Sequence, residues 1–98
     1  MTDTELNKAL ALKIGWREDQ IREYQGGISV AEHPERLVFI SNKFDYTDWN
    51  TIMPIADKYG ATMGRNASGL PYAYLNYRGI FHAQSLQKAI ALAVINNP

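Results

Sequence analysis

The two histidines and the carboxylates near them are the side chains of this chain best suited to metal binding or acid–base chemistry. His33 and His82 could act with Glu32, Asp45 or Asp48, because imidazole and carboxylate groups bind zinc and exchange protons near neutral pH. Neither histidine has the spacing of a metal-ligand motif, and neither lies beside a glycine-rich loop or a plausible nucleophile. We therefore expect no catalytic residue, no metal site and no cofactor, and we do not expect an enzyme.

Asp45 and Asp48 could also form a carboxylate pair for hydrolysis, but capping of a helix explains them with fewer assumptions. Asp45, Thr47 and Asp48 are short side chains that can accept hydrogen bonds from the free N–H groups of a first helical turn. We predict that Thr47 or Asp48 caps the central helix. We also predict that Trp49 is a buried anchor between this helix and a sheet, so that Trp49→Ala costs roughly 3–5 kcal/mol.

The tyrosines are the second set of residues with a candidate function. The chain has six Tyr and two Trp, and Tyr72 alternates with Ala73 and Tyr74 in a segment that we read as a strand. The segment 70–77 is similar, in its last six positions, to the aromatic strand of RNA-recognition domains, which stacks bases on its rings. The same face could instead bind a protein, or it could be covered by helices. We name as a candidate interaction surface Tyr72, Tyr74, Arg65 and Arg78.

The charge of the chain argues against nucleic acid as the partner. Ten Lys and Arg residues are balanced by ten Asp and Glu residues, whereas phosphate neutralisation supplies most non-specific affinity for nucleic acid. Arg65 and Arg78 are the only basic residues close to the tyrosines in sequence. We also expect Tyr77 to face the core. We expect the aromatic strand to lie near a sheet edge, because no strand follows the last helix.

Composition indicates one globular domain in a reducing compartment. The 98 residues are 46% hydrophobic and 20% charged, which is typical of one folded domain with a modest core. The absence of cysteine fits a cytosolic location, and the polar, acidic start of the chain is not a signal peptide. No apolar run is long enough to span a membrane. A net charge of zero removes one barrier to forming a homo-oligomer.

The first half of the chain predicts one helix followed by strands. Thr2 and Glu5 have the spacing of a capping box, and Gly15 is placed to end a helix over residues 3–14. Residues 17–41 look extended, with a hairpin turn at Gly26 and Gly27. The apolar run 37–40 suits a central strand that is covered on both faces.

The second half predicts the central helix, two strands and a closing helix. The central helix spans about residues 47–59 and ends at Gly60, which can adopt the left-handed conformation. Pro54 lies inside it, so we expect a kink or a helix that starts late. Strands follow at 61–65 and 71–78, joined to a last helix from Ser85 by a short connection at 79–83. The predicted fold is a single α+β domain: a mostly antiparallel sheet of about five strands packed with three helices, in the order α-β-β-β-α-β-β-α.

Three short segments together give a family resemblance that extends along the whole chain. Their sequences are Glu5-Leu6-Asn7-Lys8-Ala9 with Ile14-Gly15-Trp16; Phe44-Asp45-Tyr46 with Asp48-Trp49, Met53-Pro54-Ile55 and Lys58-Tyr59-Gly60; and Ser85-Leu86 with Lys88-Ala89-Ile90-Ala91. With these segments the chain resembles the small phage proteins of the αβα-sandwich ("ABA sandwich") domain and the related NinX-like proteins. The resemblance implies a phage genome, the host cytosol and an accessory role, and it lends no catalytic residues.

The expected function is that of a phage accessory protein that acts by binding a host or phage protein, in host takeover or in defence against host immunity. The alternative is a single-stranded nucleic-acid-binding protein that uses the Tyr72 and Tyr74 strand. The two hypotheses differ in what they require of that strand, because stacking on bases needs both open rings and nearby cations.

Overall fold

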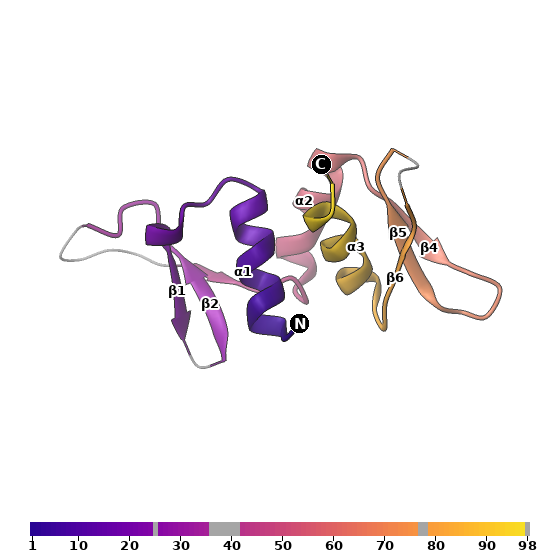
Figure 1. Cartoon of the computed structure of the whole chain (residues 1–98), viewed down its shortest axis with the longest axis horizontal. Helices are drawn as coiled ribbons and strands as arrows, with labels where there is room; N and C mark the ends of the chain where they lie inside the picture. The colour runs from indigo at the N-terminus through magenta and orange to yellow at the C-terminus, as the bar shows by residue number, and fades with distance from the viewer. Residues whose placement is uncertain (25, 36–41, 77–78, 98) are drawn as a thin grey trace. The chain divides into compact units, whose positions relative to one another are not determined.

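The computed structural model describes residues 1–24, 26–35, 42–76 and 79–97, with the side chain of Tyr24 excepted. It divides into two compact units, Met1–Asp45 and Tyr46–Pro98, which we call the N-terminal and the C-terminal unit. Each unit holds helices and a three-stranded antiparallel sheet (Figure 1).

The N-terminal unit is a helix on a small sheet. Its elements are α1 (Asp3–Lys13), the 3₁₀ turn η1 (Glu18–Gln20), β1 (Ile21–Tyr24), β2 (Gly27–Val30) and β3 (Asn42–Phe44). The strands pair in the order β1-β2-β3, and α1 packs mainly against the central strand β2 (Figure 1). The buried apolar side chains of this unit are Leu6, Leu10, Ala11, Ile28, Val30, Ala31 and Phe44.

Local signals set both ends of α1. The Thr2 hydroxyl accepts a hydrogen bond from the Glu5 N–H, and the Glu5 carboxylate accepts one from the Thr2 N–H, which completes the predicted capping box. At the other end Gly15 has φ of +115°, and the Trp16 N–H donates to the Ala11 carbonyl at 3.0 Å. The predicted helix and its glycine stop are therefore confirmed.

The predicted hairpin is also present, one residue displaced from its expected turn. Tyr24 pairs with Gly27, so Gly27 is the first residue of β2, and Gly26, with φ of +77°, takes the left-handed conformation in the turn. The strand that we predicted at 37–40 lies outside the described residues. The third strand of this sheet is β3, where Phe44 is opposite Ile28.

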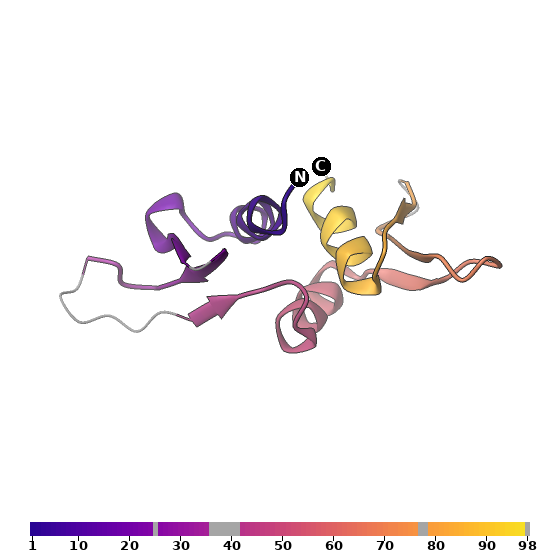
Figure 2. The same cartoon turned by 90° about the horizontal axis from the view of Figure 1, so that it is seen from below.

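The C-terminal unit consists of two helices and a second sheet. Its elements are α2 (Trp49–Tyr59), β4 (Thr62–Arg65), β5 (Pro71–Tyr74), β6 (Phe81–His82) and α3 (Leu86–Ile95). The strands pair in the order β4-β5-β6, α3 packs on this sheet, and α2 packs on α3 (Figure 2). The buried apolar side chains of this unit are Tyr46, Ile52, Ile55, Ala56, Ala73, Leu75, Ala89, Ile90, Ala91, Ala93 and Val94.

Hydrogen bonds at the start of α2 show which of the two candidates, Thr47 or Asp48, is the N-cap. The Asp48 carboxylate accepts the Asn50 N–H at 2.9 Å, so Asp48 and not Thr47 is the N-cap. Gly60 ends the helix with φ of +67° and ψ of +38°, and the Ala61 N–H donates to the Ala56 carbonyl at 2.9 Å. The predicted role of Gly60 is confirmed.

Pro54 lies in the second turn of α2, because the helix already begins at Trp49. The late start that we considered is therefore wrong. Proline has no N–H, so the Asn50 carbonyl lacks the usual donor four residues later. Asn50 and Pro54 are both exposed, and water can reach that carbonyl. The cost of proline in the helix is reduced in this way.

Trp49 is not buried, which corrects our prediction. Its side chain is 41% exposed, and Met53, one turn later, is 36% exposed. Helical side chains lean toward the helix N-terminus. A side chain on the first helical residue therefore projects beyond the turns that pack, whereas Ile52 and Ile55 lie within those turns and are buried.

The α+β class is confirmed, with three α-helices in the predicted order among the described residues. The strands form two sheets of three rather than one sheet of about five. The additional strand, β6, falls in the segment 79–83 that we predicted to be a connection, because two residues are too short to show alternation. None of the helices in the described ranges is long and apolar enough to cross a membrane. That the chain is one domain stays a prediction.

Candidate interaction surface

Strand register places the tyrosines together on one face of the β4-β5-β6 sheet. Thr62 lies opposite Tyr74, and Gly64 and His82 lie on either side of Tyr72. Residues directly opposite one another in antiparallel strands share a face. We call this set of five residues the tyrosine face.

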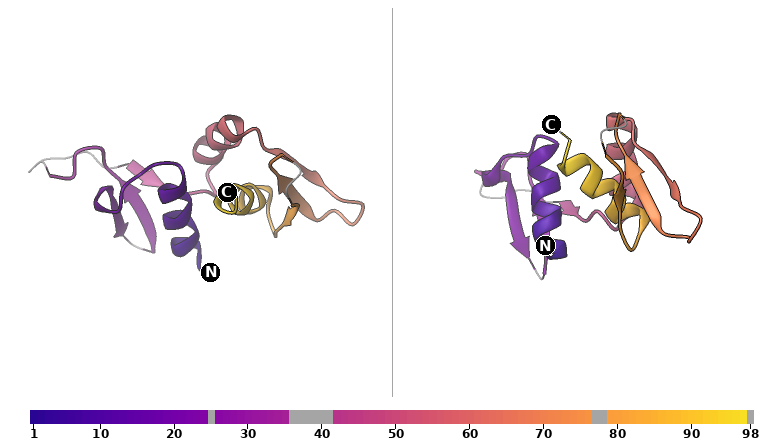
Figure 3. Two further views of the ribbon diagram at one scale, coloured as in Figure 1. Left: turned by 45° about the horizontal axis from the view of Figure 1, so that its top comes forward. Right: turned by 45° about the vertical axis from the view of Figure 1, so that its right-hand side comes forward.

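The other face of the same sheet belongs to the core. Pro71, Ala73 and Leu75 alternate with the tyrosines and are buried, and α3 packs against β5. Figures 1 and 3 show α2 and α3 on this side of the sheet, and no described helix of the C-terminal unit lies on the tyrosine face. Tyr72 and Tyr74 are accordingly half-buried by their neighbours in the sheet rather than covered by a helix.

The Tyr72 ring has one ring neighbour along β5, Tyr74, and one across the strands, His82. The ring centroids of Tyr72 and Tyr74 are 6.3 Å apart with an angle of 7° between the ring planes. The His82 ring lies 6.3 Å from that of Tyr72 at an angle of 58°. A Cβ atom at Gly64 would lie 2.8 Å from the Tyr72 hydroxyl oxygen, so the ring occupies the space that glycine leaves open. Gly64 is therefore a structural requirement of this arrangement.

The aromatic strand is central, which corrects our expectation of a place near an edge. β5 pairs with β4 on one side and with β6 on the other. We expected an edge because we counted strands after the last helix and missed β6, which precedes it. A central aromatic strand with an uncovered face is closer to the platform on which RNA-recognition domains stack bases.

Arg65 does not belong to the tyrosine face, although we placed it in the candidate surface. Its register partner is Pro71, so alternation puts Arg65 on the side of Pro71 and away from Tyr72. The Arg65 guanidinium donates to the Gly69 carbonyl at 3.0 Å and thereby braces the β4–β5 turn. Arg78 and Tyr77 lie outside the described residues. The five residues of the tyrosine face carry no Lys, Arg, Asp or Glu side chain.

The two aspartates that precede α2, Asp45 and Asp48, have structural partners. Asp48 caps the helix, and the Asp45 carboxylate lies 3.9 Å from the Lys43 ammonium group. The Thr47 carbonyl accepts a hydrogen bond from the Gln87 side chain at 3.4 Å, which links the start of α2 to α3. These contacts account for Asp48 without a hydrolytic carboxylate pair.

The two histidines lie in different units and have different neighbours. His33 Nδ1 is 3.5 Å from the Glu35 carboxylate, and His82 lies against the Tyr72 ring. Within the described residues, no group of three or more His, Asp or Glu side chains is placed to hold a metal ion. The neighbours that the structure shows are therefore Glu35 for His33 and Tyr72 for His82.

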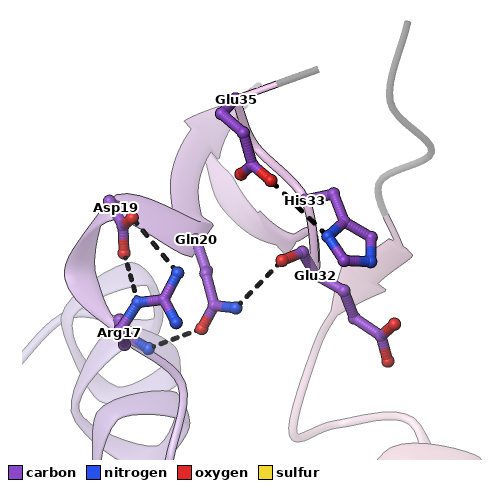
Figure 4. Close-up of polar contacts among 6 residues, drawn as sticks. All are labelled: Arg17, Asp19, Gln20, Glu32, His33 and Glu35. Atoms are coloured by element: carbon purple, nitrogen blue, oxygen red, sulfur yellow. Dashed lines mark hydrogen bonds and ion pairs between the residues drawn. The ribbon is translucent and has the colours of Figure 1, made fainter.

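The N-terminal unit also has an exposed polar cluster that we did not predict from the sequence (Figure 4). The Arg17 guanidinium donates two hydrogen bonds to the Asp19 carboxylate, at 3.0 and 3.3 Å. This pairing lowers the pKa of Asp19 and raises that of Arg17. The Gln20 side chain accepts from the Arg17 N–H at 2.9 Å and donates to the Glu32 carbonyl at 3.2 Å. These contacts join η1 to the end of the hairpin, and an exposed ion pair of this kind adds little stability.

Trp49 and Met53 form a second exposed apolar surface, on α2. They are one helical turn apart and therefore neighbours on one side of the helix. Trp is enriched at binding hot spots and Met adapts to irregular partners. We missed this pair because helical periodicity alone assigned Trp49 to the core.

Comparison with known proteins identifies no relative: no family model, no curated protein and no solved structure matches this chain. The resemblance to the phage αβα-sandwich and NinX-like proteins therefore stays a prediction from the sequence.

Proposed function

We propose that the chain is a non-enzymatic binding protein whose tyrosine face contacts another protein. The observation that carries the proposal is the row of Tyr72 and Tyr74 rings on a central strand, on a sheet face without a covering helix of its unit. Tyrosine supplies a large contact area with few rotatable bonds, and it is enriched at interface hot spots. The short ring-to-ring distances keep this surface ordered before a partner binds.

The biological setting follows from the sequence resemblance. It makes the protein a phage accessory factor in the cytosol of an infected host, with a host or phage protein as its partner. Host takeover and defence against host immunity are the roles that such a factor would serve. A homo-oligomer is also compatible with the zero net charge.

Capture from cell lysates tests the proposal. Tagged full-length protein is used to recover partners from infected and uninfected cells, alongside a Tyr72→Ala, Tyr74→Ala variant and a matched Trp49→Ala, Met53→Ala variant. Circular dichroism confirms that each variant is folded. We expect one stoichiometric partner, retained by the α2 variant and lost by the tyrosine variant.

Two outcomes would count against the proposal. Recovery of no stoichiometric protein from either lysate would remove the proposed binding function. Loss of the partner in the α2 variant alone would keep the function and move the contact surface to Trp49 and Met53.

Single-stranded nucleic acid is the second candidate, favoured by the central position of β5. The uncharged tyrosine face argues against it, because most non-specific affinity for nucleic acid comes from cations at phosphates. We predict no micromolar binding to labelled single-stranded DNA or RNA at physiological salt, as measured by fluorescence anisotropy. Saturable binding that disappears in the folded Tyr72→Ala, Tyr74→Ala variant would reverse the order of the two candidates.

A further inference from the structure

We infer that two copies of this chain pair through the outer edge of strand β4 and extend the β4-β5-β6 sheet across a twofold axis. β4 is an edge strand, because it pairs with β5 on one side and, among the described residues, with no strand on the other (Figure 1). An edge strand presents a row of unpaired N–H and C=O groups to other chains. Dimerisation through this edge adds to the proposed function without depending on it.

The other edge strands that the structure describes have features that oppose such pairing. β6 has two residues, and β3 has three with the exposed Lys43 at its centre. In β1, self-pairing that uses most of the strand sets Arg22 against the partner's Arg22, or Glu23 against the partner's Glu23. Short edges, edge lysines and like charges directly opposite one another all disfavour association. β4 has four residues without lysine or proline, and its one charged residue, Arg65, is the last. It is therefore the edge that lacks this protection.

Hydrogen bonding to β5 determines which backbone groups of β4 point outward. The Asn66 N–H donates to the Leu70 carbonyl at 3.0 Å, in the same register as the β4–β5 pairs. Successive residues of an antiparallel strand direct their backbone groups alternately to one side and to the other. The N–H and C=O groups of Gly64 therefore point toward β5, whereas those of Met63 and Arg65 point away from it. Met63 and Arg65 are the residues that a further strand can bond.

These two residues make the edge complementary to itself. A twofold axis perpendicular to the sheet at Gly64 sets Met63 opposite the partner's Arg65, and Arg65 opposite the partner's Met63. Both are hydrogen-bonded pairs, each with two N–H···O bonds, because both residues direct their backbone groups outward. The outward groups of each copy are thus satisfied by those of the other. A net charge of zero adds no long-range repulsion between the copies.

The side chains of β4 fit this register. At the axis the two Gly64 residues form a non-hydrogen-bonded pair with Cα atoms about 4.5 Å apart, and glycine brings no side chain to this close approach. Beside them the aliphatic stem of Arg65 can cover the partner's Met63, which is half-buried within one copy. The axis keeps both tyrosine faces on the same side of the sheet. Because the Tyr72 hydroxyl group lies over Gly64, the two Tyr72 rings approach one another beside the axis.

Sedimentation equilibrium and amide hydrogen exchange of the full-length protein test the inference together. From micromolar to submillimolar concentration we expect a reversible equilibrium between monomer and dimer. The amides of Met63 and Arg65 should exchange more slowly as the dimer fills, because they gain acceptors on the partner. This measurement needs no substitution and reports on the proposed edge directly.

The outer edge of β1 provides an internal control in the same sample. The Ala31 N–H donates to the Gln20 carbonyl at 2.9 Å, in register with the β1–β2 pairs. By the same alternation, the amides of Ile21 and Glu23 point away from β2. Their exchange should not depend on protein concentration.

Two substitutions of one residue test the register. Met63→Lys sets an ammonium group opposite the partner's Arg65, and Met63→Glu sets a carboxylate there, while both remove the same apolar side chain. The pair occurs twice in each dimer, so Met63→Lys should dimerise about tenfold more weakly than Met63→Glu, or weaker still. Glu23→Ala, on the edge of β1, should dimerise like the parent protein. Circular dichroism confirms that each variant is folded.

Three results would overturn the inference. The first is a protein that stays monomeric up to submillimolar concentration. The second is a dimer in which Met63 and Arg65 exchange as fast as in the monomer, or in which Ile21 and Glu23 become protected instead. The third is equal dimerisation of the lysine and glutamate variants.

Discussion

Asp48 is the residue on which the start of α2 depends. Its carboxylate accepts the Asn50 N–H at 2.9 Å, whereas Thr47 contributes its carbonyl to a bond with Gln87. We predict that Asp48→Ala lowers the free energy of unfolding by about 1 kcal/mol, the usual value of an N-cap side chain. Thr47→Ala is the matched control and should cost clearly less. Urea unfolding of both variants measures the difference, and equal costs would contradict the assignment of the cap.

Glu5, at the start of α1, makes the stability of the fold depend on pH. Hydrogen bonding to the Thr2 backbone and side chain lowers the pKa of Glu5 below its ordinary value of 4.5. A lowered pKa in the folded state stabilises the fold above pH 4.5, and this contribution is lost as the pH falls through the folded-state pKa. We predict that Glu5→Gln unfolds at a lower temperature than the parent at pH 6 and that the difference shrinks by pH 3. A difference that grows on acidification would contradict the capping box.

The helix caps show for which residues the structural role can be predicted from the sequence. The Thr2–Glu5 box and the Gly60 stop depend on neighbours within a few positions, so the sequence predicted them. For the same reason it limited the cap of α2 to Thr47 or Asp48. Arg65 was misplaced because it precedes the tyrosine strand by a few residues in sequence, whereas its register partner across the strands is Pro71. The contact between Gly64 and Tyr72 joins two strands and leaves no local signal.

Apolar residues of α2 differ in how deeply they are buried. Ile52 is fully buried and Trp49 is 41% exposed. We predict that Ile52→Ala costs about 2–5 kcal/mol, as for a buried aliphatic side chain, and that Trp49→Ala costs only about 1–2 kcal/mol. Thermal and urea unfolding of the two variants measure the order of these costs. A Trp49→Ala protein that is destabilised as strongly as Ile52→Ala would mean that Trp49 belongs to the core after all.

The elements differ in how well the sequence predicted them. Helices α1 and α3 and the alternating strand β5 have periodic patterns and were predicted near their observed positions. β6 has two residues and no pattern to detect, yet it moves the aromatic strand from an edge to the centre of its sheet. The division of the strands into two sheets depends on pairing between distant segments, which composition and periodicity do not encode.

At the scale of the whole molecule, length indicated one domain and the structure contains two compact units. Each unit has its own sheet and its own buried side chains. Each also holds only about half of the 98 residues. Chains of this size approach the limit below which folding needs disulfides or metals, and this chain has no cysteine.

The chain carries one tryptophan in each unit, and these can report on whether the units unfold together. Trp16 belongs to the N-terminal unit and Trp49 to the C-terminal unit. In Trp49→Phe the fluorescence therefore follows the first unit, and in Trp16→Phe it follows the second. Because neither unit is large enough to be comfortably stable by itself, we predict one cooperative transition. In each variant the fluorescence midpoint in urea should coincide with the midpoint from far-ultraviolet circular dichroism, which reports on both units. Comparison within one variant cancels any stability change that the substitution itself causes. Two separated midpoints in either variant would show two independently folding domains and would contradict the single domain that length and composition predict.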